Sequence, residues 1–189
     1  MRALKLALAL CIAQPFAGLR AADDVSIEAT RRDDALEVVC RATLAAPAAL
    51  IWETLTDYDH LAEFIPGMRS SQVLSRRGAV SVVAQVGEAH FLFFSVPIEV
   101  TLASTERPPN LIEAKLLKGT LKRMDGAYRI APQSGGRALL SWTGVVEADA
   151  MPPLFGELVM RANIEAQFRG MVREIERRDA QRRESGAGK

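Results

Sequence analysis

The feature that most constrains the fold is a run of strand-like segments that ends in one long helical segment. From Phe94 to Leu102, apolar residues alternate with serine, proline, glutamate and threonine, the period-two pattern of a half-buried strand. The alternation recurs in residues 112–116, 124–130 and 140–146 with short connections, which predicts an antiparallel meander. A helix is predicted from Pro153 to near Arg183. A single sheet with one long helix must bury its apolar face against that helix.

The first part of the chain predicts a hairpin followed by two short helices. Val25–Thr30 and Leu36–Leu44 are strand-like and flank a polar turn. The segment Pro47–Gly67 follows, and its last two residues, proline and glycine, stop the second helix. Its apolar positions at helical spacing are Ala48, Ile51, Trp52 and Leu55, and then Tyr58, Leu61, Phe64 and Ile65.

Two strands are predicted between residues 80 and 102, at Val80–Gly87 and His90–Leu102. Pro97 lies inside the second strand and cannot donate a ladder hydrogen bond, so we expect it at an edge, a bulge or a break. Cys40 lies within an apolar strand, where burial is more plausible than a reactive thiol.

Several of these segments together resemble the START-like superfamily, which includes polyketide cyclases/dehydrases, lipid-transfer domains and coenzyme-Q-binding proteins. The resemblance rests on Trp52 one turn before Leu55-Thr-Asp-Tyr58, on Leu61, Phe64 and Pro66, and on the run Met124-Asp-Gly-x-Tyr128. It extends from about Leu36 to Arg178. It implies an α+β helix-grip fold, in which a curved antiparallel sheet of about six to eight strands wraps around the C-terminal helix. It also implies a hollow that holds a hydrophobic ligand.

The first 21 residues have the layout of a secretory signal peptide. Arg2 and Lys5 form a basic start, an apolar run covers Leu6–Ala13, and small residues follow up to Ala22. The apolar run is too short to span a bilayer. We therefore predict a signal peptide at 1–21, a single domain at 22–183 and a flexible tail at 184–189, with the mature protein in the periplasm or secreted.

The charge balance and the motifs of the chain argue against several classes of function. Of the 24 basic residues, Arg2, Lys5 and Arg20 lie in the signal segment, which leaves 21 against 23 acidic residues, a net charge of −2. This balance gives no basic footprint for nucleic acid. No Cys/His cluster has metal-ligand spacing and no phosphate-binding glycine loop occurs, so we predict neither a metal nor another cofactor. A monomer with at most transient membrane contact is favoured.

The ionisable residues near the apolar segments each allow a catalytic and a structural interpretation. His60 stands three residues after Asp57 and could act as a general base, but an exposed histidine stabilised by nearby acids is favoured. Asp57 is interpreted as a cap for the second short helix. His90 is interpreted as a hydrogen-bonded group in the pocket wall rather than a catalyst. No catalytic residue is therefore predicted.

The leading functional prediction is a module that encloses a lipid or an isoprenoid quinone-like molecule. An enzyme of the cyclase/dehydrase type that uses the same pocket, and a structural or partner-binding domain with a filled core, remain alternatives. The short segment Tyr58–Arg69 is the predicted gate, and the alternative is that Phe64 and Ile65 anchor it to the sheet. The candidate lining residues are Trp52, Tyr58, Phe64, Ile65, His90, Phe94, Met124, Tyr128, Trp142, Met160, Ile164, Phe168 and Met171.

Overall fold

The computed structural model describes residues 25–91, 94–148 and 156–187. The predicted signal peptide at 1–21 and the predicted helix start at Pro153 lie outside these residues. The strands are β1 Val25–Arg32, β2 Ala35–Leu44, β3 Met68–Arg77, β4 Val80–Phe91, β5 Phe94–Arg107, β6 Leu111–Gly119, β7 Leu121–Pro132 and β8 Ala138–Ala148. The helices are α1 Ala48–Leu55, the 3-10 helices η1 Tyr58–Glu63 and η2 Ser134–Gly136, and α2 Gly156–Ala187.

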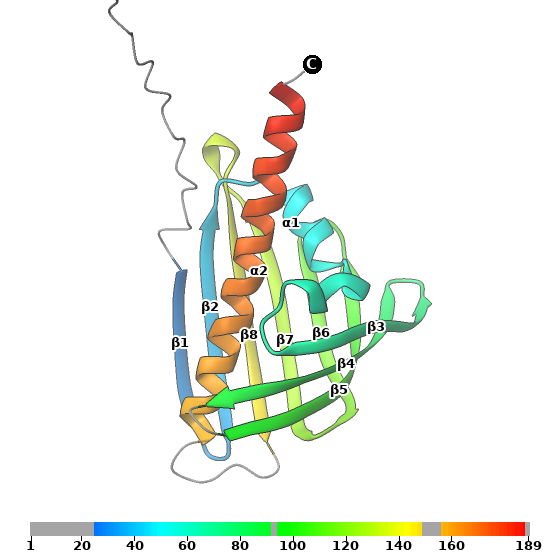
Figure 1. Cartoon of the computed structure of the whole chain (residues 1–189), viewed down its shortest axis with the longest axis vertical. Coiled ribbons are helices and arrows are strands. Elements are labelled where there is room, and N and C mark those ends of the chain that lie inside the picture. Colours follow the sequence, from blue (N-terminus) through cyan, green and yellow to red (C-terminus); the bar gives the residue numbers. More distant parts are fainter. Residues whose placement is uncertain (1–24, 92–93, 149–155, 188–189) are drawn as a thin grey trace, which may run out of the picture.

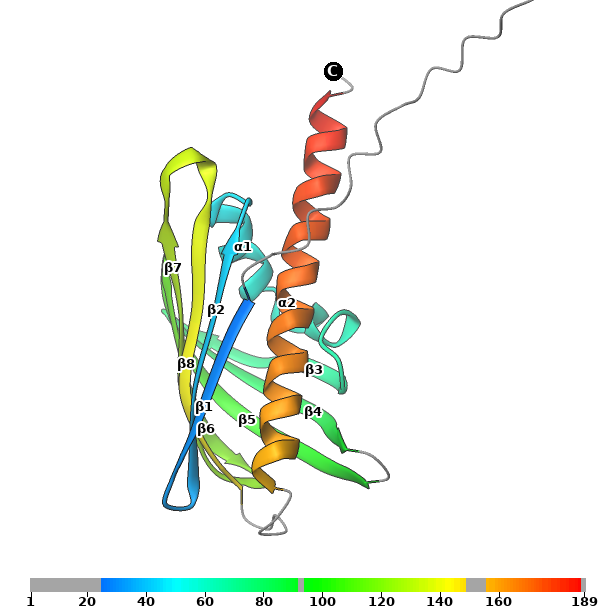
Figure 2. The same ribbon diagram turned by 90° about the vertical axis from the view of Figure 1, so that its left-hand side faces the viewer.

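The strands form one antiparallel sheet in the order β1-β2-β8-β7-β6-β5-β4-β3. From β3 to β8 the sheet is a meander, and the β1–β2 hairpin adds to its β8 edge. The sheet curves so that β3, β4 and β5 cross below α1 and η1, and α2 runs along the concave face (Figure 1; Figure 2). The helix-grip fold predicted from the sequence is confirmed.

The concave face of the sheet carries the core, as the period-two patterns predict. On β2, Val38, Cys40, Ala42 and Leu44 are fully buried, whereas Arg41 between them is exposed. Burial raises the pKa of the Cys40 thiol to about 12, so it stays protonated at neutral pH. This is the buried strand cysteine that the sequence predicted.

The hairpin between β4 and β5 differs from the prediction. We expected a break after Gly87, but β4 continues to Phe91, and Gly87 pairs with Ile98 inside the ladder. A Cβ added at Gly87 would lie 2.5 Å from the carbonyl oxygen of Gly67. This glycine therefore marks a close approach of two backbone segments, not a turn.

Pro97 lies where β5 has one described partner. Its neighbour on β4 is Glu88, and β5 pairs with β6 only from Val100 onward. The missing N–H of Pro97 thus removes no ladder bond to β6, which agrees with the prediction of an edge position.

The long helix α2 continues to Ala187, four residues beyond its predicted end at Arg183. Arg183 forms an ion pair with Asp179 one turn earlier, with an N–O distance of 2.7 Å. The Ser185 hydroxyl donates to the Gln181 carbonyl at 2.8 Å. These contacts within the helix explain why a charged sequence is helical here. No helix in the described parts of the chain is long and apolar enough to cross a membrane.

Candidate functional site

A cavity of about 170 Å³ lies between the concave face of the sheet, α2 and the segment that begins with η1. Its wall is mostly aliphatic and aromatic, and polar side chains are few. The helical side of the wall consists of Leu55, Tyr58, Leu61, Ile65, Met160, Asn163, Ile164, Gln167, Phe168 and Met171. The sheet side and the adjoining loop contribute Gly67, Met68, Gln85, Val86, Gly87, Glu88, Ile98, Val100, Leu102, Ser104, Ile112, Ala114, Leu121, Met124, Tyr128, Trp142 and Val146.

Most of the residues that the sequence proposed for a pocket lie together in this wall. They are Tyr58, Ile65, Met124, Tyr128, Trp142, Met160, Ile164, Phe168 and Met171. The α2 members come from the stripe with helical spacing, and the β7 and β8 members come from the inner positions of two paired strands. The structure brings these side chains to one cavity, and their part in ligand binding stays a prediction.

Three of the proposed residues lie elsewhere, and each has a local reason. Trp52 is half-buried on α1, because the helix buries Leu50 and Thr54 instead, and the Thr54 hydroxyl donates to the Leu50 carbonyl at 2.8 Å. Phe64 is half-buried outside the wall, with the guanidinium carbon of Arg178 5.5 Å from its ring centre.

His90 is the third residue outside the wall. Because β4 continues past the expected break, His90 lies near the end of that strand, and its side chain is 60% exposed. Its Nε2 lies 3.1 Å from Glu88 Oε1. The prediction that His90 lines the pocket is therefore corrected. The side chain of Phe94 lies outside the described part of the structure.

Sequence reasoning missed the wall formed by β4, β5 and β6. Val100, Leu102 and Ser104 are consecutive inner positions of β5, and Ile112 and Ala114 face them on β6. The period-two pattern does indicate that these residues share one face of the sheet. It does not indicate which part of that face meets α2 and which part borders a void, because that depends on the curvature of the sheet.

A pair of glycines creates the floor under Trp142. Gly126 on β7 and Gly144 on β8 are partners in the ladder, next to the pair Tyr128 and Trp142. A Cβ added at Gly126 would lie 2.9 Å from Trp142 Nε1, and one added at Gly144 would lie 2.6 Å from Trp142 Cζ2. The indole therefore lies flat across both glycines and extends from β8 toward β7. Because the ring lies flat, the cavity space above the ring stays open.

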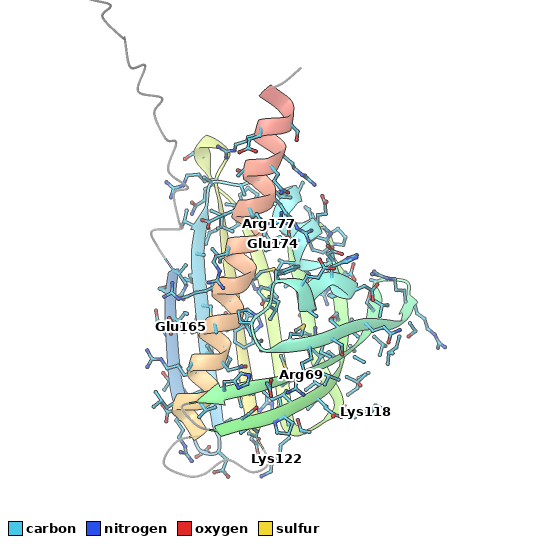
Figure 3. All side chains as sticks on the ribbon, in the orientation of Figure 1. Arg69, Lys118, Lys122, Glu165, Glu174 and Arg177 are labelled. Atoms are coloured by element: carbon cyan, nitrogen blue, oxygen red, sulfur yellow. The ribbon has the colours of Figure 1, made fainter. Side chains whose placement is uncertain are left out.

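A few polar side chains, which we call the polar rim, interrupt the apolar wall of the cavity. Asn163 and Gln167 of α2 lie there, and the Gln167 amide donates to Asn163 Oδ1 at 3.0 Å. On the sheet side, Arg69 Nη2 and the Ser95 hydroxyl each donate to Glu88 Oε2 at 2.6 Å. These two hydrogen bonds lower the pKa of Glu88 to about 2, so its carboxylate is ionised at neutral pH. Figure 3 shows Arg69 beside the lower half of α2.

The family model for polyketide cyclase / dehydrase and lipid transport matches residues 44–180, which is more than half of the chain. This chain belongs to that family. The matched region includes every wall residue described above. No curated protein sequence matches the chain.

Several solved structures share the fold of this family member. The aromatase/cyclase Zhui from Streptomyces sp. R1128 superposes with a TM-score of 0.65 and 22% identity, over 76% of this chain and 95% of the other. A START superfamily protein from Mycobacterium smegmatis superposes with a TM-score of 0.64 and 18% identity, over 75% of this chain and 97% of the other. A STAR-related lipid transfer protein from Xanthomonas axonopodis superposes with a TM-score of 0.64 and 10% identity, over 81% of this chain and 99% of the other. At these identities the similarity establishes the fold alone.

The polyketide cyclase/lipid transport domain also carries an ionic network outside its cavity, between η1 and α2. Arg178 Nη2 donates to Asp57 Oδ2 at 2.8 Å, and Arg178 Nε donates to Glu174 Oε1 at 2.7 Å. Arg177 also donates to Glu174, and the two lie together on the upper half of α2 (Figure 3). These hydrogen bonds lower the pKa of Glu174. The network ties the start of η1 to α2.

Asp57 and His60 meet in this network rather than in the cavity. Asp57 stands at the N-cap position of η1 but makes no capping hydrogen bond, which corrects our prediction of a cap. Its Oδ1 lies 2.6 Å from His60 Nδ1 because Arg178 holds the carboxylate toward α2. Burial raises the pKa of Asp57, but hydrogen bonds from His60 and Arg178 outweigh it and lower the pKa overall.

We expect His60 to titrate above its usual value of 6.5, because the hydrogen bond to Asp57 and the negative charge of Asp57 raise its pKa. While Asp57 is ionised, the stability that the charged His60 adds is full below pH 6.5 and is lost as the pH rises through the higher folded pKa of His60. NMR titration of the imidazole measures this pKa. Asp57→Asn should return it toward 6.5, whereas Asp59→Asn should change it little. An unshifted His60 in the unaltered protein would contradict the geometry.

Proposed function

We propose that this domain binds a hydrophobic small molecule, a lipid or an isoprenoid quinone-like compound, and carries it outside the cytoplasm. The observation that supports binding is the cavity, whose wall is apolar apart from a few polar groups. Removal of apolar ligand surface from water stabilises the complex by about 25 cal/mol per Å². The layout of the first 21 residues supports export.

The size of the cavity limits how much of such a ligand it encloses. A volume of about 170 Å³ slightly exceeds that of a cavity of ~150 Å³ known to hold benzene. Pockets for drug-sized ligands occupy about 300–1,000 Å³. In this conformation the site therefore accommodates one ring or a short chain segment. The rest of a longer ligand would extend past the polar rim, or the wall would have to open.

A cyclase/dehydrase-type enzyme is the second candidate. Its support is the fold similarity to the aromatase/cyclase Zhui, together with Glu88, an ionised carboxylate at the cavity rim. Such an enzyme would need an acid or a base near the reacting atom of the substrate. Glu88 is a weak base, because Arg69 and Ser95 lower its pKa to about 2. His60 and His90 are exposed and lie outside the wall. These placements favour the carrier.

Filling the cavity should strongly weaken binding without unfolding the domain. Ala114 lines the cavity on β6, and Ala114→Phe would add a ring of about the size that the cavity holds. Fluorobenzene binding can be followed by ¹⁹F NMR titration. We expect saturable binding to the unaltered protein and at least a roughly tenfold weaker affinity in the variant, about 1.4 kcal/mol.

Ala127 provides the matched control for this experiment. It follows Gly126 on β7 and pairs with Glu113 and Thr143, on the opposite face of the sheet from the cavity. Ala127→Phe should leave fluorobenzene binding unchanged. If Ala114→Phe binds fluorobenzene as tightly as the unaltered protein does, the cavity is not the binding site.

A further inference from the structure

Two hydrogen-bond donors in the cavity wall have no partner. No hydrogen bond joins the Tyr128 hydroxyl or the Trp142 indole N–H to a described residue, both side chains line the cavity, and neither atom is sealed from it as the Tyr58 hydroxyl is. Buried tyrosine hydroxyls and tryptophan N–H groups usually find a partner. A donor left unpaired in an apolar interior costs about 1–3 kcal/mol. Two such donors side by side therefore point to a group that arrives with the ligand.

Both donors are held in place by the sheet. Tyr128 and Trp142 are partners on adjacent strands, and their ring centres are 6.5 Å apart with the planes inclined by 52°. The flat position of the indole over Gly144 and Gly126 puts Nε1 above β7, on the side of the cavity. Only 7% of Trp142 is exposed, and because its Nε1 is not sealed, this N–H is open to a group that enters the cavity.

Tyr128 lies deep in the molecule and yet keeps accessible surface. Burial raises the pKa of its phenol, which therefore stays protonated and can donate. The side chain is nevertheless only half-buried by accessible area, and because it lines the cavity, its accessible surface faces the void. A ligand oxygen in the void can therefore reach the hydroxyl without a change in the fold.

Tyr58, the other tyrosine of the wall, differs in this respect. Its hydroxyl is also unpaired, but that oxygen atom is sealed from the void as well as from solvent. It faces Ser104 and Glu106, which influence its pKa without standing in hydrogen-bonding geometry. Glu106 Oε1 already accepts a hydrogen bond from the Ser81 hydroxyl at 2.8 Å. Tyr58 thus provides a matched comparison for Tyr128.

We propose that Tyr128 and Trp142 donate hydrogen bonds to an oxygen on the enclosed end of the ligand. The ligand would then be an apolar molecule whose buried ring or chain segment carries a carbonyl or a similar acceptor, and not a plain hydrocarbon tail. This inference rests on the proposed binding function and specifies the chemistry of its ligand. The carbonyl is the matching acceptor because each donor presents one hydrogen and a carbonyl oxygen has two lone pairs.

The test uses two probes of one shape. Acetophenone carries a carbonyl where α-methylstyrene carries a methylene group. Affinities for both are measured by NMR titration in the unaltered protein, Tyr128→Phe and Tyr58→Phe, so that each probe is compared with itself across variants. Tyr128→Phe should weaken the affinity for acetophenone roughly two- to tenfold, which is the range expected for one net hydrogen bond. It should leave the affinity for α-methylstyrene unchanged. Tyr58→Phe should change the affinities for the two probes by the same factor, because its hydroxyl does not reach the void.

The indole resonances give an independent measurement. The chain has two tryptophans, and Trp52 lies outside the cavity wall, so its N–H is an internal reference. Acetophenone should move the Trp142 N–H signal downfield, α-methylstyrene should not, and the Trp52 signal should stay in place. Trp52→Phe assigns the two signals.

The outcomes separate this inference from the function on which it rests. If both probes bind and neither Tyr128→Phe nor the Trp142 signal distinguishes them, the donor pair does not recognise an oxygen, while the binding function stands. If neither probe binds, the binding function is wrong for ligands of this size, and the inference is overturned with it.

Discussion

Replacing Gly144 by alanine is expected to destabilise the protein by about 3 kcal/mol and to abolish binding of fluorobenzene. The added Cβ would lie 2.6 Å from Trp142 Cζ2 and 2.8 Å from the carbonyl oxygen of Asp125 on the partner strand. Because Trp142 lines the cavity, an indole displaced from Gly144 would move into the void. The backbone oxygen of Asp125 can move only if β7 and β8 separate locally. The same substitution therefore fills the void and strains the ladder.

Gly126 separates these two effects. A Cβ at Gly126 would lie 2.9 Å from Trp142 Nε1, and its three nearest atoms all belong to that indole. Gly126→Ala should therefore displace Trp142 and weaken binding, but cost less stability than Gly144→Ala. Chemical denaturation gives the free energies of unfolding.

A double substitution tests the cause directly. In a Trp142→Leu background, Gly126→Ala should become nearly neutral, since the clashing ring is gone, whereas Gly144→Ala should still destabilise through Asp125. If Gly126→Ala costs as much with Trp142→Leu as without it, the indole does not lie on the glycine pair in solution.

The architecture was predictable because most of the chain follows simple periodicities. The alternation in β5 and β7 identified their inner faces, and the stripe Met160, Ile164, Phe168 and Met171 identified the face of α2 that borders the cavity. These patterns report only which residues avoid water. The same pattern of apolar residues occurs around a solid core and around a cavity. The cavity itself was therefore expected from the family resemblance and not from the periodicity of the residues.

The errors arose where a residue type has two physical uses. Gly87 was interpreted as a strand end, but it permits the approach of the Gly67 carbonyl, and this shifted the predicted position of His90. Trp52 was placed on the buried stripe of its helix, but α1 buries Thr54, whose hydroxyl is satisfied within the helix, and leaves Trp52 half-buried. Asp57 matched a cap, but Arg178, 121 positions later, binds its carboxylate. For Gly87 and Asp57 the deciding partner is distant in sequence, which a local pattern does not reveal.

The second large effect is expected at Gly170, where α2 crosses the end of the segment that follows η1. A Cβ added at Gly170 would overlap Pro66 Cδ and lie 2.9 Å from the carbonyl oxygen of Phe64. Gly170→Ala should therefore push residues 64–66 away from α2 and weaken the contact between Arg178 and the Phe64 ring. We expect the free energy of unfolding to fall by about 2 kcal/mol, although alanine stabilises a helix by up to ~1 kcal/mol relative to glycine.

The same substitution tests whether this segment gates the cavity. Ile65 belongs to the wall, while Asp57 and Gly67 fix the segment through Arg178 and through the hydrogen bond from Glu88 N to the Gly67 carbonyl. If the segment is the gate, Gly170→Ala should raise hydrogen exchange in Tyr58–Arg69 and speed fluorobenzene dissociation roughly tenfold.

Gly186→Ala is the matched control, because the same change in the same helix meets no atom within 4 Å. It should leave exchange in Tyr58–Arg69, fluorobenzene dissociation and stability nearly unchanged. If Gly170→Ala raises exchange in Tyr58–Arg69 but leaves dissociation as slow as in the unaltered protein, the segment anchors α2 to the sheet, and ligand enters by another part of the wall.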